Sequence, residues 1–146
     1  MSQTALLLIA HGSRHEPANV DLRDLAGRLA AEGEHPIVEA SFLELTEPGI
    51  AEGGRRCVDR GASLVLMIPY FLSAGVHLLR DLTAARDDLA GRHPDVEFRL
   101  GVPLGPHSLL DQLVRERAGQ LAAGEESSSF SPSPDLAGRY APMDGQ

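Results

Sequence analysis

Two histidines and one glutamate stand in similar places along the chain, each just after an apolar segment. The residues are His11, Glu44 and His77, and the segments before them are residues 5–10, 36–42 and 64–69. If these segments are parallel strands, all three side chains lie at the carboxyl edge of one sheet, where open α/β sheets bind their ligands. Two imidazoles and a carboxylate suit a divalent transition metal. The pattern therefore predicts a metal site at that edge.

Each of these residues also has a purely structural interpretation. Gly12 lets the backbone turn off the strand after His11, which then either binds a ligand or hydrogen-bonds to the loop. Glu44 either faces the site or is only a charge at a helix entry. His77 opens the next helix, where the helix dipole favours the neutral imidazole that binds metals, although a capping or buried histidine fits the same position.

The residues around the two histidines suggest a surface for a ligand. Ser13 either caps the following helix or orients His11, and Arg14 is placed to face an anion. The loop from 69 to 77 contains Tyr70, Phe71 and Leu72, which are costly to expose. We expect this loop to line a pocket for a flat apolar ligand or to contact a partner subunit.

The elements that position these residues alternate along the first 123 residues. We expect strands at 5–10, 36–42, 63–69 and 96–102, and helices at 17–32, 48–60, 77–91 and 106–122. This alternation predicts right-handed crossovers and a parallel sheet covered on both faces. Residues 1–123 are expected to form one domain, and residues 124–146, rich in Ser and Pro, a disordered tail.

The composition of the chain limits which partners and which cellular location we expect. The net charge of −8 argues against nucleic-acid binding. The longest apolar run, residues 5–10, is too short to span a membrane and has no secretion-signal features. Cys57 is the single cysteine, which excludes an internal disulfide and a cysteine-rich zinc site. We therefore expect a cytoplasmic protein without nucleic-acid or membrane partners.

A hydrolase of similar architecture is disfavoured. Histidine phosphatases have an Arg directly before the histidine that follows their first strand, whereas Ala10 precedes His11 here. The chain also contains neither a Gly-x-Ser-x-Gly elbow nor a phosphate loop.

Three motifs together resemble the signatures of one enzyme family. They are Ile9-Ala10-His11-Gly12-Ser13-Arg14, Phe42-Leu43-Glu44, and the segment from Pro69 to His77 with Arg80-Asp81. In this order and spacing, over residues 5–105, they resemble the small single-domain form of the CbiX-type sirohydrochlorin chelatases. The resemblance implies a chelatase-like three-layer α/β/α fold with a four-stranded parallel sheet. It also implies insertion of Co²⁺, or of Fe²⁺ or Ni²⁺, into the tetrapyrrole sirohydrochlorin.

The resemblance further assigns roles to individual residues. His11 and His77 are the expected metal-binding and catalytic histidines, and Glu44 is their acidic partner, a ligand or a general base. Residues expected to contact the carboxylate-rich substrate are Ser13, Arg14, Phe71, Leu72, Val76 and Arg80. We expect no permanently bound cofactor, since the metal is a substrate, and we expect a homodimer. The alternative function is a metal-binding or metal-delivery module without chelatase activity.

Overall fold

The computed structural model describes residues 3–126, so the expected tail from residue 127 onward lies outside the described residues. The chain divides into two units, residues 1–104 and residues 105–146. The domain boundary expected after residue 123 stays a prediction.

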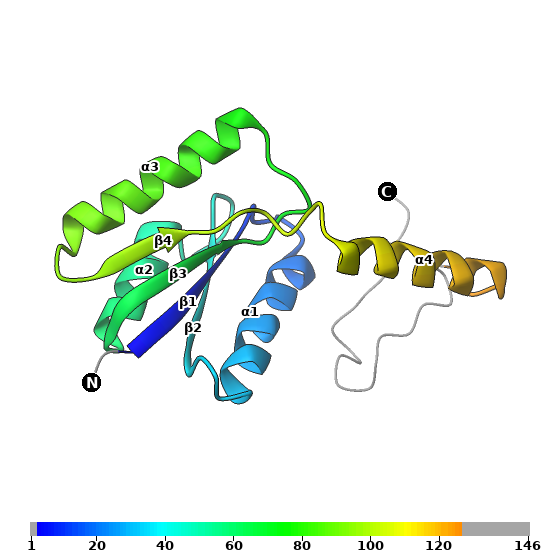
Figure 1. The fold of residues 1–146 in the computed structure, drawn as a ribbon, viewed down its shortest axis with the longest axis horizontal. Helices are drawn as coiled ribbons and strands as arrows, with labels where there is room; N and C mark the ends of the chain where they lie inside the picture. The colour runs from blue at the N-terminus through cyan, green and yellow to red at the C-terminus, as the bar shows by residue number, and fades with distance from the viewer. Residues whose placement is uncertain (1–2, 127–146) are drawn as a thin grey trace. The chain divides into compact units, whose positions relative to one another are not determined.

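The first unit is an all-parallel four-stranded sheet with helices on both faces, as predicted (Figure 1). Its elements are β1 (Gln3–Ala10), α1 (Glu16–Ala31), β2 (Ile37–Phe42), α2 (Ile50–Asp59), β3 (Ala62–Pro69), α3 (Val76–Arg92) and β4 (Glu97–Leu100). The strand order is β2-β1-β3-β4. The chain runs outward from β1 to β2 and then crosses to β3 on the other side of β1. The carboxyl ends of β1 and β3 therefore form the switch point at which such sheets place their ligand sites.

Apolar side chains on both faces of the sheet make two cores. One core lies under α1 and consists of Leu8, Leu22, Ala26, Val38, Ala40 and Phe42. The other lies under α2 and α3 and includes Leu7, Ile9, Cys57, Val65, Met67, Phe71, Leu82 and Leu89. The central strand β1 contributes to both cores because successive side chains of a strand point to opposite faces. This is why residues 5–10 are continuously apolar in the sequence.

The strand expected over 96–102 is shorter than predicted, because β4 ends at Leu100. The register pairs Met67 with Leu100, so Val102 would stand opposite Pro69. Proline has no amide hydrogen to donate, and the pairing ends before this position. Val102 is correspondingly 83% exposed.

The described part of the second unit contains one helix, α4 (Ser108–Ala122). The His107 side chain caps it, with Nδ1 accepting a hydrogen bond of 3.0 Å from the Leu109 amide. The helix confirms the sequence prediction, but none of its side chains is buried, and Leu109 and Val114 of its apolar stripe are 67% and 68% exposed. No helix between residues 3 and 126 is long and apolar enough to cross a membrane.

Candidate metal and substrate site

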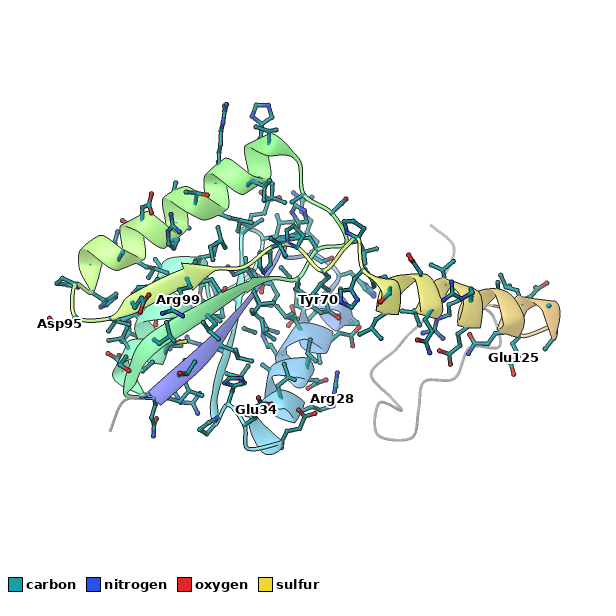
Figure 2. All side chains as sticks on the ribbon, viewed as in Figure 1. Arg28, Glu34, Tyr70, Asp95, Arg99 and Glu125 are labelled. Carbon is teal, nitrogen blue, oxygen red and sulfur yellow. The ribbon has the colours of Figure 1, made fainter. Side chains whose placement is uncertain are left out.

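The three predicted metal-site residues all follow the carboxyl ends of strands. His11 directly follows β1, Glu44 lies two residues after β2, and His77 is the second residue of α3, beyond the loop that follows β3. All three are exposed. Figure 2 marks this end of the sheet by Tyr70, while Glu34 and Asp95 mark the opposite end.

Backbone hydrogen bonds join the His11 and Glu44 loops. The Leu43 amide donates to the Ala10 carbonyl oxygen at 2.9 Å, and the Glu44 amide donates to the His11 carbonyl oxygen at 3.0 Å. These bonds extend the pairing of β1 with β2 beyond the ends of both strands. The two predicted site residues are thus brought together through their main chains.

Gly12 makes this approach possible. Its φ is +89°, and a Cβ at this position would lie 1.9 Å from the Glu44 carbonyl oxygen. Any residue other than glycine would have to push the two loops apart. The predicted turn at Gly12 is therefore confirmed, and its close contact with the Glu44 backbone is a further constraint.

The Phe71 ring packs against the His11 ring. The two rings are in edge contact, with centroids 4.6 Å apart and an interplanar angle of 76°. Phe71 is only 7% exposed and belongs to the core, whereas Tyr70 and Leu72 are 44% and 70% exposed. Phe71 is therefore a core residue whose ring contacts His11, and its expected contact with the substrate stays a prediction.

The structure does not gather the predicted ligands into one cluster. Among residues 3–126, no three His, Cys, Asp or Glu side chains lie close enough together to hold a metal ion. The assignment of His11, Glu44 and His77 as ligands stays a prediction. Cys57 is a poor candidate to join them, because burial raises the pKa of its thiol to about 12 and keeps it protonated.

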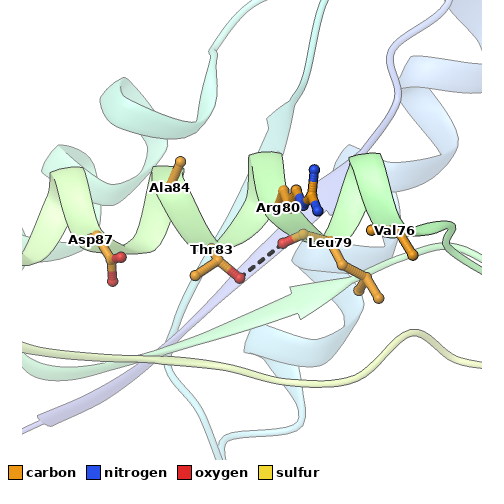
Figure 3. A pocket seen from close by; sticks show the side chains of 6 residues that line it. All are labelled: Val76, Leu79, Arg80, Thr83, Ala84 and Asp87. Carbon is orange, nitrogen blue, oxygen red and sulfur yellow. Dashed lines mark hydrogen bonds between the residues drawn. The ribbon is translucent and has the colours of Figure 1, made fainter.

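An open groove of about 430 Å³ runs along α3. Its lining includes two of the predicted substrate contacts, Val76 and Arg80 (Figure 3). The hydroxyl of Thr83 in this groove donates to the Leu79 carbonyl oxygen at 2.8 Å. Within the described part of the chain, the guanidinium groups of Arg80 and Arg14 form no ion pair or hydrogen bond. Both cations are therefore free to meet an anionic ligand.

Sequence reasoning missed Asn19, which fixes the loop after His11. Asn19 is 2% exposed and exchanges two hydrogen bonds with the Ser13 backbone, of 2.9 and 2.7 Å. The Ser13 hydroxyl accepts from the His15 amide at 3.0 Å. The signal was a polar residue on the buried face of a helix, three positions before Leu22 and seven before Ala26.

Comparison with known proteins identifies the family. A model of the CbiX family matches residues 5–121. The chain belongs to the CbiX family. It is 33% identical to the chloroplastic sirohydrochlorin ferrochelatase of Arabidopsis thaliana, an alignment that covers 77% of this chain and 50% of that protein. A sirohydrochlorin cobaltochelatase of Methanococcoides burtonii is 30% identical, and the alignment covers 77% of this chain and 92% of the relative.

A solved structure of a CbiX relative supports the same fold. The sirohydrochlorin chelatase SirB from Bacillus subtilis subspecies spizizenii, in complex with cobalt, superposes with a TM-score of 0.75 at 30% identity. The match covers 82% of this chain and 51% of SirB. The chain thus spans about half the length of SirB and of the Arabidopsis relative, and nearly all of the relative from Methanococcoides burtonii.

Proposed function

We propose that this protein inserts a divalent metal ion into sirohydrochlorin. The observation that carries the proposal is the CbiX match over residues 5–121, which includes the joined His11 and Glu44 loops at the carboxyl edge of the sheet. The relatives named above are a ferrochelatase and a cobaltochelatase, which supports Co²⁺ and Fe²⁺ as substrates. Imidazole and carboxylate ligands also accept Ni²⁺, so the donor set does not select one of these ions.

The reaction exchanges one metal ion for two protons of the macrocycle. The ion must lose part of its water shell and be held over the ring, and the two pyrrole N–H protons must leave. In the proposal, neutral His11 and His77 hold the ion weakly, as is needed for an ion that is passed on. Glu44 accepts protons as a general base. All three side chains are exposed at one edge of the sheet, where a broad ligand has access.

The surroundings provide both kinds of surface that a carboxylate-bearing tetrapyrrole needs. Arg14 and Arg80 are the proposed partners of its carboxylates, since neither is paired with another described residue. Leu72 and Val76 are 70% and 63% exposed and offer apolar contacts to the ring. Phe71 acts from the core by supporting the His11 ring. Ser13 is proposed to act on the substrate only through its loop, because its hydroxyl accepts from the chain itself.

We also propose that the protein works as a homodimer. A tetrapyrrole is a broad disc, and the described edge covers one side of it. The exposed Tyr70 and Leu72 provide an apolar patch that a two-fold axis would pair with itself. A second copy would then supply the opposite wall of the site.

A single cysteine in the chain accords with the cytoplasmic location expected above, since extracellular domains commonly rely on disulfides.

A spectroscopic assay tests the function. Metal insertion changes the visible spectrum of sirohydrochlorin, so the protein is mixed with it and with Co²⁺, Ni²⁺ or, anaerobically, Fe²⁺. We expect acceleration above the rate without protein for at least one of these ions. A protein that binds the ion but leaves every rate unchanged is a metal-delivery module, and the chelatase proposal is then wrong.

A further inference from the structure

The loops that bear His11 and Glu44 are both attached to the first turns of α1. Asn19 holds the loop after His11 through its two hydrogen bonds to the Ser13 backbone. Arg23, one helical turn further along, reaches the loop after Glu44. Residues four apart in a helix lie on the same face, so one face of α1 contacts both loops.

Arg23 makes four contacts with its surroundings. Its Nη2 atom donates to the Thr46 hydroxyl at 3.2 Å and to the Glu47 carbonyl oxygen at 3.0 Å. Its Nη1 atom lies 2.5 Å from a carboxylate oxygen of Glu16. The guanidinium carbon stands 5.3 Å from the centre of the Phe42 ring, a cation–π geometry.

Glu16 links the two attachments into one network. Its other carboxylate oxygen accepts from Asn19 Nδ2 at 3.0 Å, so the chain of contacts runs from Ser13 to Thr46 without a break. The hydrogen bond from Asn19, and then that from Arg23, lowers the pKa of Glu16. The Glu16 carboxylate, which joins Asn19 to Arg23, therefore stays charged down to a lower pH than an ordinary glutamate does.

The turn that Arg23 holds is a strained one. Leu45 has a φ of +67°, and the Thr46 amide donates to the Glu44 carbonyl oxygen at 2.8 Å, which makes a γ-turn with a left-handed centre. Such backbone conformations cost about 1–3 kcal/mol and persist only where neighbouring groups fix them. Arg23 contacts both residues that follow Leu45 and fixes the turn from outside.

We propose that Arg23, with Asn19 and Glu16, is a positioning residue of this site: the three fix the spacing between the His11 and Glu44 loops without touching the substrate. The proposal rests on the proposed function, since the spacing matters for catalysis only if both side chains act on the metal or the macrocycle. Loss of Arg23 releases the turn at Leu45 and lets the Glu44 carboxylate move away from its working position.

The test compares Arg23→Met with a matched control, Arg60→Met. Arg60 also pairs with a carboxylate, Glu39 at 3.1 Å, and with a backbone carbonyl, that of Pro36 at 3.3 Å. It is similarly exposed, with 46% of its side chain accessible against 37% for Arg23. Pro36 precedes β2, so Arg60 holds the amino edge of the sheet, away from the site.

The two variants are expected to separate stability from catalysis. A misplacement of about 1 Å can lower a rate on the order of 100-fold. We expect Arg23→Met to lower kcat for Co²⁺ insertion by roughly 10–100-fold while KM for sirohydrochlorin changes less than about 2-fold. Arg60→Met should keep the wild-type kcat even if its Tm falls as much as that of Arg23→Met. Arg23→Lys, which retains the charge near Glu16 but not the fork, should be intermediate, and it serves if Arg23→Met does not fold.

Amide hydrogen exchange gives a readout that does not need activity. The Glu44 amide donates to the His11 carbonyl oxygen. It should exchange faster in Arg23→Met than in the wild type, and at the wild-type rate in Arg60→Met. A wild-type protein that inserts no metal overturns the chelatase function, and faster Glu44 exchange confined to Arg23→Met still supports the network. The proposal is overturned if an active Arg23→Met variant keeps the wild-type kcat, or if kcat falls equally in Arg60→Met. It is also overturned if exchange of the Glu44 amide does not change in Arg23→Met.

Discussion

Replacement of Gly12 by alanine tests whether the contact between the His11 and Glu44 loops is needed for activity. The new Cβ would lie 1.9 Å from the Glu44 carbonyl oxygen. An ordinary contact between these atoms is about 3.3 Å, so one loop must move by about 1.4 Å. The left-handed φ adds roughly 1–2 kcal/mol for a residue with a side chain. Loss of the hydrogen bond between the Glu44 amide and His11 adds about 1 kcal/mol.

Gly33 provides a control that shares the strain but not the clash. Its φ is +86°, and no atom lies within 4 Å of its added Cβ. It stands between α1 and β2, at the amino edge of the sheet. Gly33→Ala should therefore cost only the roughly 1–2 kcal/mol of the left-handed conformation.

The measurements are urea unfolding and the rate of Co²⁺ insertion for both variants. We expect Gly12→Ala to lose roughly 2–3 kcal/mol of stability. Its kcat should fall about 100-fold or more, because the displacement exceeds 1 Å at the reacting groups. Gly33→Ala should turn over like the wild type. A Gly12→Ala variant with wild-type kcat would refute the claim that the spacing of the two loops serves catalysis.

Further predictions concern the ligands and the assembly. His77→Ala should abolish most Co²⁺ insertion and leave the unfolding curve unchanged, because His77 is exposed. Glu44→Gln should lower kcat more than Co²⁺ affinity measured by calorimetry; an equal loss of affinity makes Glu44 a ligand rather than a base. Light scattering should report about twice the chain mass of 15.6 kDa. An active monomer would show that the site is not shared between two copies. If the dimer is built on the apolar patch of Tyr70 and Leu72, Leu72→Ser should weaken it.

The order of the elements could be predicted from the sequence because the hydrophobic periods differ between strands and helices. Residues 5–10 had to be a strand covered on both sides, and β1 is central in the sheet. The placement of His11, Glu44 and His77 at one edge followed from the parallel arrangement alone.

Distances within the site could not be predicted in this way. The burial of Phe71 depends on how its loop folds back, with the Leu104 amide donating to the Phe71 carbonyl oxygen at 2.9 Å. The role of Arg23 depends on residues 23 and 24 positions away in the sequence, which no local pattern reveals. Asn19 alone left a trace, a polar residue on a buried helix face.

We propose that this chain inserts a metal ion into a tetrapyrrole through His11, the histidine that directly follows β1. The most direct measurement follows the visible spectrum of sirohydrochlorin with Co²⁺, comparing wild type, His11→Ala and no protein. We predict that the wild type accelerates the spectral change and that His11→Ala returns it to the rate without protein. A wild-type rate equal to the rate without protein, in a sample that binds Co²⁺, would show that the protein is not a chelatase.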